Sequence, residues 1–160
     1  MSSYIDRIRL FVDQSVSPII LRNELPDICS RSQMNRLIKQ ACDDGLLIRV
    51  SKGVYVKARQ SRITGLPVPA VAGGFSQLVR LVLARLDIEY VESEPWFEYQ
   101  LGISKQIPAN SMLYVPKSCS RQIEFGVMKA NLIRKSRKEI EQIKRKYSTL
   151  ISENHYFRTL

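Results

Sequence analysis

The sequence, 160 residues long, lacks the features that mark membrane proteins and exported proteins. It contains no apolar run approaching the roughly 20 residues that a membrane-spanning helix needs. Its first ten residues, MSSYIDRIRL, carry Asp6 and lack the basic and then apolar pattern of an export signal. We therefore expect a cytoplasmic protein that does not attach to a membrane.

The sequence is also poor in metal ligands and in reactive side chains. Its three cysteines, Cys29, Cys42 and Cys119, are widely spaced, and its one histidine, His155, lies near the end of the chain. This spacing matches no zinc motif and brings no Cys–His pair together. We expect buried thiols in a reducing compartment, a surface histidine, and neither a metal nor another cofactor.

No enzyme motif is recognisable. The glycine pair within residues 72–74 is not followed by the Lys-Ser/Thr of a phosphate-binding loop. Four glutamates lie between residues 89 and 98, and their alternation across a predicted strand and loop favours a solvated acidic edge over a metal or acid–base site. The sequence therefore predicts a protein that is not an enzyme and has no catalytic residues. The glutamates are Glu89, Glu92, Glu94 and Glu98.

What the sequence has in excess is positive charge. Lys and Arg total 25 against 15 Asp and Glu, which gives a net charge of +10 and a sequence pI near 9.8. Such an excess attracts polyanions, which include nucleic acid, anionic membranes and acidic partners. Because all three fit the net charge, the choice depends on where the charges lie.

The first 29 residues predict a helix, a short strand and a brief second helix. Apolar residues in 4–14 recur at the spacing of one helical face, and Ser3 stands before them as a cap. The apolar stretch 19–21 follows as a strand. Residues 23–29 suit a second helix, which Pro26 restricts to a short one.

The next segment predicts a third helix followed by a β-hairpin. Ser30 and Gln33 have the spacing of a capping box, and Gly45 is placed to end the helix in the left-handed conformation. The two runs in LLIRVSKGVYVKA are apolar and β-branched, and a polar turn with Gly53 separates them. The apolar face of the predicted helix consists of Met34, Leu37, Ile38 and Ala41.

This order is that of a winged helix-turn-helix, and we assign it to residues 1–58. Residues 59–74, rich in glycine and proline, predict an extended linker. Residues 75–160 predict a small α+β domain with an apolar helix from Phe75, strands near 88–91, 111–115, 122–125 and 130–133, and a terminal helix over 135–152. The sequence therefore predicts an α+β protein of two domains.

The face of the third helix opposite its apolar stripe carries the side chains that read DNA. Arg donates twice to guanine, Asn and Gln pair with adenine, and Ser and Lys hold phosphates. No acidic residue interrupts this face before Asp43. A solvated helix face is the alternative, and the winged-helix order favours contact with duplex DNA. The predicted contacts on the helix are Arg31, Ser32, Gln33, Asn35, Arg36 and Lys39.

The hairpin supplies the second predicted DNA-binding element. Arg49, Ser51, Lys52 and Lys57 lie on or near its turn, where a wing follows the phosphates or the minor groove. A Lys-Gly pair also simply makes a good turn. The hairpin therefore indicates DNA binding only together with the helix that precedes it.

The stretch CDDGLLIRVSKGVYVKARQSRITGLPVPAVAGGFSQLV resembles the N-terminal region of the AbiEi-like antitoxins of bacterial type IV toxin–antitoxin systems. The resemblance extends over roughly residues 4–135 and is most specific at the wing and the linker. It implies a DNA-binding repressor of its own operon that opposes a nucleotidyltransferase-like toxin without a stable complex. It also implies roles in DNA binding for Arg49, Lys52 and the exposed residues of the third helix.

Two other functions stay open at this point. The first alternative is a winged-helix transcriptional regulator without a toxin partner. The second is an RNA-binding or protein-interaction module on the same scaffold. If the protein forms a homodimer, its two-fold symmetry predicts an operator of inverted half-sites.

Overall fold

The computed structural model describes residues 2–108 and 112–148. The described residues form a mixed α+β protein with five α-helices and small sheets. Contacts divide the chain into two compact units. The first comprises Met1–Arg85 and Arg121–Lys129, and the second comprises Leu86–Ser120 and Ala130–Leu160. The α+β fold class is confirmed, and the N-terminal order of elements is compatible with a winged helix.

The first unit begins as the sequence predicts. Helix α1 spans Tyr4–Gln14, and Ser3 and Asp6 cap it reciprocally. Strand β1 spans Ile19–Leu21. The predicted second helix is wrong, because a single 3-10 turn, Arg22–Glu24, takes its place. The Glu24 carboxylate accepts a hydrogen bond from the Leu21 amide and tightens this turn, and Pro26 then prevents it from continuing as a helix.

Helix α2, Arg31–Asp43, is the predicted third helix. The Ser30 hydroxyl caps it by accepting a hydrogen bond from the Gln33 amide. Gly45 follows the helix with φ +74°, the left-handed conformation that glycine adopts at low cost. The apolar faces of α1 and α2 pack against the sheet. Their shared core includes Ile8, Val12, Ile20, Met34, Ile38, Ala41, Leu47 and Tyr55.

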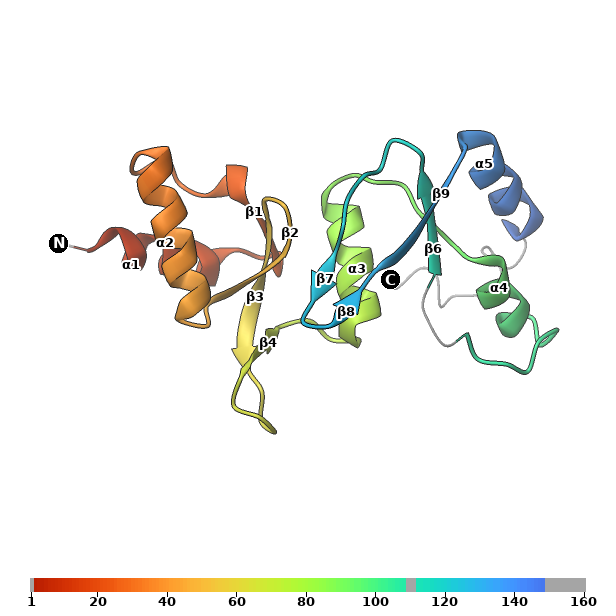
Figure 1. Ribbon diagram of the computed structural model, residues 1–160, viewed down its shortest axis with the longest axis horizontal. Helices are drawn as coiled ribbons and strands as arrows, with labels where there is room; N and C mark the ends of the chain where they lie inside the picture. Colours follow the sequence, from red (N-terminus) through yellow and green to blue (C-terminus); the bar gives the residue numbers. More distant parts are fainter. Residues whose placement is uncertain (1, 109–111, 149–160) are drawn as a thin grey trace. The chain divides into compact units, whose positions relative to one another are not determined.

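The sheet of the first unit has the strand order β1-β3-β2, with β2 at Leu47–Ser51 and β3 at Val54–Gln60. Both neighbours of β3 are antiparallel to it, and the β2–β3 turn contains Gly53 with φ +69°. Strand β4, Pro67–Pro69, pairs with the C-terminal half of β3. Part of the segment predicted as a linker is therefore a strand of the sheet (Figure 1).

Two later segments also belong to the first unit. Helix α3, Gly74–Arg85, contacts β1, and Arg85 forms an ion pair with Glu24. A short hairpin of β7, Glu124–Phe125, and β8, Met128–Lys129, contacts β2. These units divide the chain differently from the predicted domains 1–58 and 75–160.

The second unit pairs a three-stranded sheet with two helices. The strand order is β5-β6-β9, with β5 at Val91–Glu92, β6 at Met112–Pro116 and β9 at Asn131–Lys135. Strand β6 is antiparallel to β5. It is parallel to β9, an arrangement that needs a long connection, and between β6 and β9 the chain leaves this sheet to form the β7–β8 hairpin.

Helices α4, Glu94–Gln100, and α5, Arg137–Lys146, complete the second unit. Phe97 of α4 stacks on Tyr147 at a ring-centroid distance of 4.3 Å, within a core that also contains Val91, Ile140 and Ile143. The predicted terminal helix is confirmed over Arg137–Lys146, and its expected continuation to residue 152 lies outside the described residues. None of the described helices is long and apolar enough to span a membrane.

The predicted acidic edge at residues 89–98 is wrong in part. Residues 94–100 form α4 rather than a loop, and Glu92 is buried in β5. Glu89 and Glu94 form ion pairs with Lys144 and Lys146 of α5. These acidic side chains therefore help to attach α5 within the second unit.

Candidate nucleic-acid interface

Helix α2 has two faces of opposite character. Met34, Leu37, Ile38 and Ala41 are buried in the core, as the sequence predicts. The other face is exposed along the whole length of the helix and contains every predicted α2 contact. Its exposed residues are Arg31, Ser32, Gln33, Asn35, Arg36, Lys39 and Gln40.

The exposed cations of α2 differ in whether they have a partner. The Lys39 ammonium lies 2.8 Å from a carboxylate oxygen of Asp43, and this hydrogen bond raises the pKa of Lys39. Arg31 and Arg36 form no ion pair with the other described residues. The Ser32 hydroxyl lies 3.2 Å from that of Ser30 at the helix N-terminus. Arg31 and Arg36 are therefore the charges that α2 leaves available to an anion.

The predicted wing residues separate into two groups. Arg49 and Lys52 are exposed, on β2 and in the β2–β3 turn. Lys57 is half-buried, pairs with Leu47 at the opposite end of the hairpin from the turn, and donates from Nζ to the Ser15 carbonyl oxygen. Lys57 therefore joins β3 to the α1–β1 connection and lies away from the wing turn.

Ser51 differs from the sequence expectation. Its side chain is 7% exposed, and its hydroxyl has no hydrogen-bond partner within the described part of the chain. The register between β2 and β3 shifts between Arg49 and Ser51, so that Ser51 pairs with Val54. This irregularity turns the side chain inward, where it is not accessible to a phosphate in this conformation.

The wing turn is held from two sides. The Arg22 amide donates to the Gly53 carbonyl oxygen at 2.9 Å, and the Arg121 guanidinium donates to the Lys52 carbonyl oxygen at 2.5 Å. Sequence reasoning missed both anchors. Arg121 is 69 residues from Lys52, and no local pattern connects the two positions.

The three cysteines are wholly or partly buried. Burial raises the pKa of the Cys42 thiol, and burial likewise raises the pKa of the neighbouring Tyr55 hydroxyl. Cys119 is buried, whereas Cys29 and Cys42 are half-buried. The expectation of buried thiols is therefore confirmed for Cys119 and holds in part for the other two. His155, expected at the surface, lies outside the described residues.

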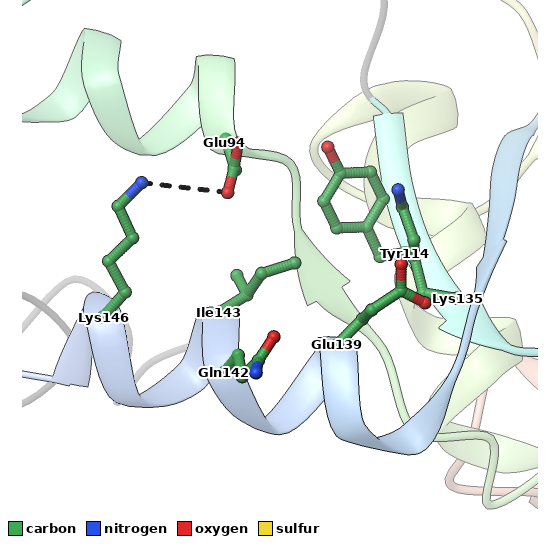
Figure 2. A pocket seen from close by; sticks show the side chains of 7 residues that line it. All are labelled: Glu94, Tyr114, Lys135, Glu139, Gln142, Ile143 and Lys146. Atoms are coloured by element: carbon green, nitrogen blue, oxygen red, sulfur yellow. Dashed lines mark ion pairs between the residues drawn. The ribbon is translucent and has the colours of Figure 1, made fainter.

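The second unit contains a pocket of about 300 Å³ between β6, the end of β9 and helices α4 and α5. The Tyr114 ring and Ile143 form its apolar part, and Figure 2 shows a lysine toward each end. The Lys146 ammonium lies 3.8 Å from the Glu94 carboxylate, and that of Lys135 lies 5.2 Å from the centre of the Tyr114 ring.

The carboxylates of this pocket balance its lysines. Glu139 accepts a hydrogen bond of 2.7 Å from the Ser136 amide, and the hydrogen bonds with Ser136 lower the pKa of Glu139. The lining therefore carries two carboxylates against two ammonium groups. Unlike the exposed face of α2, this pocket does not concentrate charge of one sign.

A family model matches residues 8–154, which include most of both units. The chain belongs to DUF6088, a family of unknown function. Comparisons with curated proteins and with solved structures returned no match. The resemblance to AbiEi-like antitoxins stays a prediction.

Proposed function

We propose that the protein binds duplex DNA, with α2 in the major groove and the β2–β3 turn beside the phosphates. The observation that carries this proposal is the exposed face of α2, where Arg31 and Arg36 stand without a carboxylate partner among the described residues. The buried face of the same helix fixes it to the sheet, so the exposed side chains project from a rigid element. Rigid placement favours direct readout of base edges.

The residues of this face divide by the contacts that they favour. Arg36 can donate two hydrogen bonds to a guanine, and Gln33 and Asn35 can pair with adenine. Arg31 and Ser32 lie in the first turn, where free backbone amides and the helix dipole attract a phosphate. Arg49 and Lys52 extend the positive charge to the wing. The net charge of +10 adds a long-range attraction to the polyanion.

The proposal extends to the biological role. By its resemblance to the AbiEi-like antitoxins, the protein represses its own operon in the cytoplasm and opposes a nucleotidyltransferase-like toxin without a stable complex. This role includes no catalytic step. A homodimer on inverted half-sites is the arrangement that we propose on DNA, because two-fold protein symmetry requires two-fold symmetry in the operator.

Hydroxyl-radical footprinting on the DNA upstream of the gene tests this proposal. We expect a short protected region, and two protected half-sites related by inversion if the protein is a dimer. Arg36→Ala should weaken this protection, whereas Arg7→Ala, an equal charge change on the exposed face of α1, should leave it intact. Protection that is absent, or spread evenly over the fragment, would contradict a sequence-reading function.

The antitoxin role needs a separate test. Expression of a nucleotidyltransferase-like protein encoded by a neighbouring gene should arrest growth, and co-expression of the proposed antitoxin should restore it. Growth that stays arrested, together with an intact footprint, would leave a transcriptional regulator without a toxin partner.

A further inference from the structure

The turn of the proposed wing depends on a residue that lies far away in sequence. Arg121 stands in the segment after β6 and donates from Nη1 to the Lys52 carbonyl oxygen at 2.5 Å. The same segment continues into β7, which contacts β2. Residues 121–129 thus belong to the DNA-binding unit, although the sequence on both sides of them belongs to the second unit.

The local structure of the wing explains why such an anchor matters. The β3 side of the turn is supported by β1, because Leu21 pairs with Val54 and the Arg22 amide donates to the Gly53 carbonyl oxygen. Strand β2 lies at the edge of its sheet, and its register is irregular immediately before the turn. The Ser51 hydroxyl there is buried without a hydrogen bond among the described residues, which costs stability. The bond from Arg121 attaches the far side of this turn to the rest of the unit.

Arginine is well suited to this contact. Its guanidinium is always charged and carries five donors in a fixed fork, so it holds a carbonyl oxygen at a defined angle. A charge-assisted hydrogen bond to the Lys52 carbonyl also fixes the backbone from which the exposed Lys52 side chain projects.

We propose that Arg121 is a positioning residue for DNA binding, which holds the wing turn so that Lys52 meets a phosphate. This inference rests on the proposed function. Residues 121–129 are continuous in the chain with Ser120 and Ala130, which belong to the second unit.

Hydrogen exchange without DNA tests the anchor itself. In the full-length protein, Arg121→Ala should speed amide exchange in a peptide covering residues 49–56 and leave a peptide within α2 unchanged. Arg121→Lys should restore part of the protection. Lys129→Ala, which removes the same charge from an exposed position on β8, serves as the matched control and should exchange like the wild type. Unchanged exchange in Arg121→Ala would overturn the proposal.

DNA affinity then tests positioning against direct contact. We expect Arg121→Ala to weaken binding about five- to tenfold, and to cause little further loss when Lys52 is already alanine. A loss that is the same in both backgrounds would show that Arg121 touches DNA itself and would overturn the positioning role. If the wild type binds no DNA, the proposed function fails, while the exchange result still decides whether Arg121 holds the wing.

Discussion

Helices α2 and α5 are both amphipathic and both rich in basic residues, but they use their charges differently. On α2, Arg31 and Arg36 project without a carboxylate partner in the described part of the chain. On α5, Arg137 pairs with Glu141, and Lys144 and Lys146 pair with glutamates of the same unit. Lys138 and Arg145 are exposed on α5 as well, but they share that helix with the exposed carboxylates of Glu139 and Glu141, whereas α2 has no acidic residue before Asp43. The net charge of the chain does not distinguish these helices, whereas the placement of acidic residues does. This comparison favours α2 as the surface for a polyanion.

The largest expected effect is a loss of folding stability, of similar size in the two units. Replacing Ile38 of α2 with alanine should lower the free energy of unfolding by about 2–4 kcal/mol, because its side chain is 4% exposed within the core. Ile140→Ala in α5, where the side chain is 1% exposed, should cost a similar amount. Urea denaturation measures both changes.

Affinity for DNA should distinguish these two variants where stability does not. At a temperature at which both remain folded, Ile38→Ala should weaken DNA binding and Ile140→Ala should leave it within about twofold. Equal losses of affinity would show that α5 contributes to the DNA surface as much as α2 does, and the comparison would fail.

The next effect concerns the exposed arginine of α2. Arg36→Ala should cost about 1–3 kcal/mol of binding free energy and relax the preference at one base position. Arg137→Ala on α5 is the matched control, because Arg137 is also exposed and its ion pair is long, at 3.9 Å. Binding measured on a set of single-base variants of the operator would reveal the change. A uniform loss on every sequence would show that Arg36 contacts phosphate only.

A smaller effect is expected at the wing. Lys52→Ala should weaken binding evenly across sequences and make the slope of log affinity against log salt shallower by about one. The same substitution at Lys144, which is paired with Glu89, should leave the slope unchanged. An unchanged slope in Lys52→Ala would remove the wing from the interface.

The smallest expected effect is a loss of stability at two helix N-termini at low pH. In α1 and α5, the hydrogen bonds with Ser3 and Ser136 lower the pKa values of Asp6 and Glu139 below their ordinary values near 4. Each carboxylate therefore contributes stability above its unfolded pKa, and this contribution is lost as the pH falls through the lowered, folded value. Helix α2 has no acidic residue in its first turn. Amide exchange between pH 6 and pH 3 should show the N-termini of α1 and α5 loosening while that of α2 does not. Loosening of all three alike would contradict this account.

Sequence periodicity was sufficient for the elements that have one clear apolar face. Helices α1, α2 and α3 and the β2–β3 hairpin follow the predicted ranges closely, because local spacing and the caps at Ser3 and Ser30 determine them. Helix α4 was missed, although Ser93 before Glu94 and Pro95 is a recognisable helix start.

The remaining differences come from contacts between distant residues. Lys57 was assigned to the wing because it is basic and close in sequence, whereas its side chain reaches back to Ser15. Ser51 was predicted at the surface, and the register shift in β2 buries it. Arg121 has no sequence neighbour that connects it with the wing. Such long-range contacts are set by tertiary structure, which local patterns do not encode.

Fluorescence anisotropy tests the central claim most directly. The full-length protein is titrated onto labelled duplex DNA from upstream of its gene and onto a scrambled duplex of equal length, across a salt series. We predict tighter binding to the upstream DNA and a difference in affinity that persists as salt rises, because base contacts are less sensitive to salt than phosphate contacts. Equal affinity for both duplexes, lost steeply and together with increasing salt, would contradict sequence-specific recognition by α2.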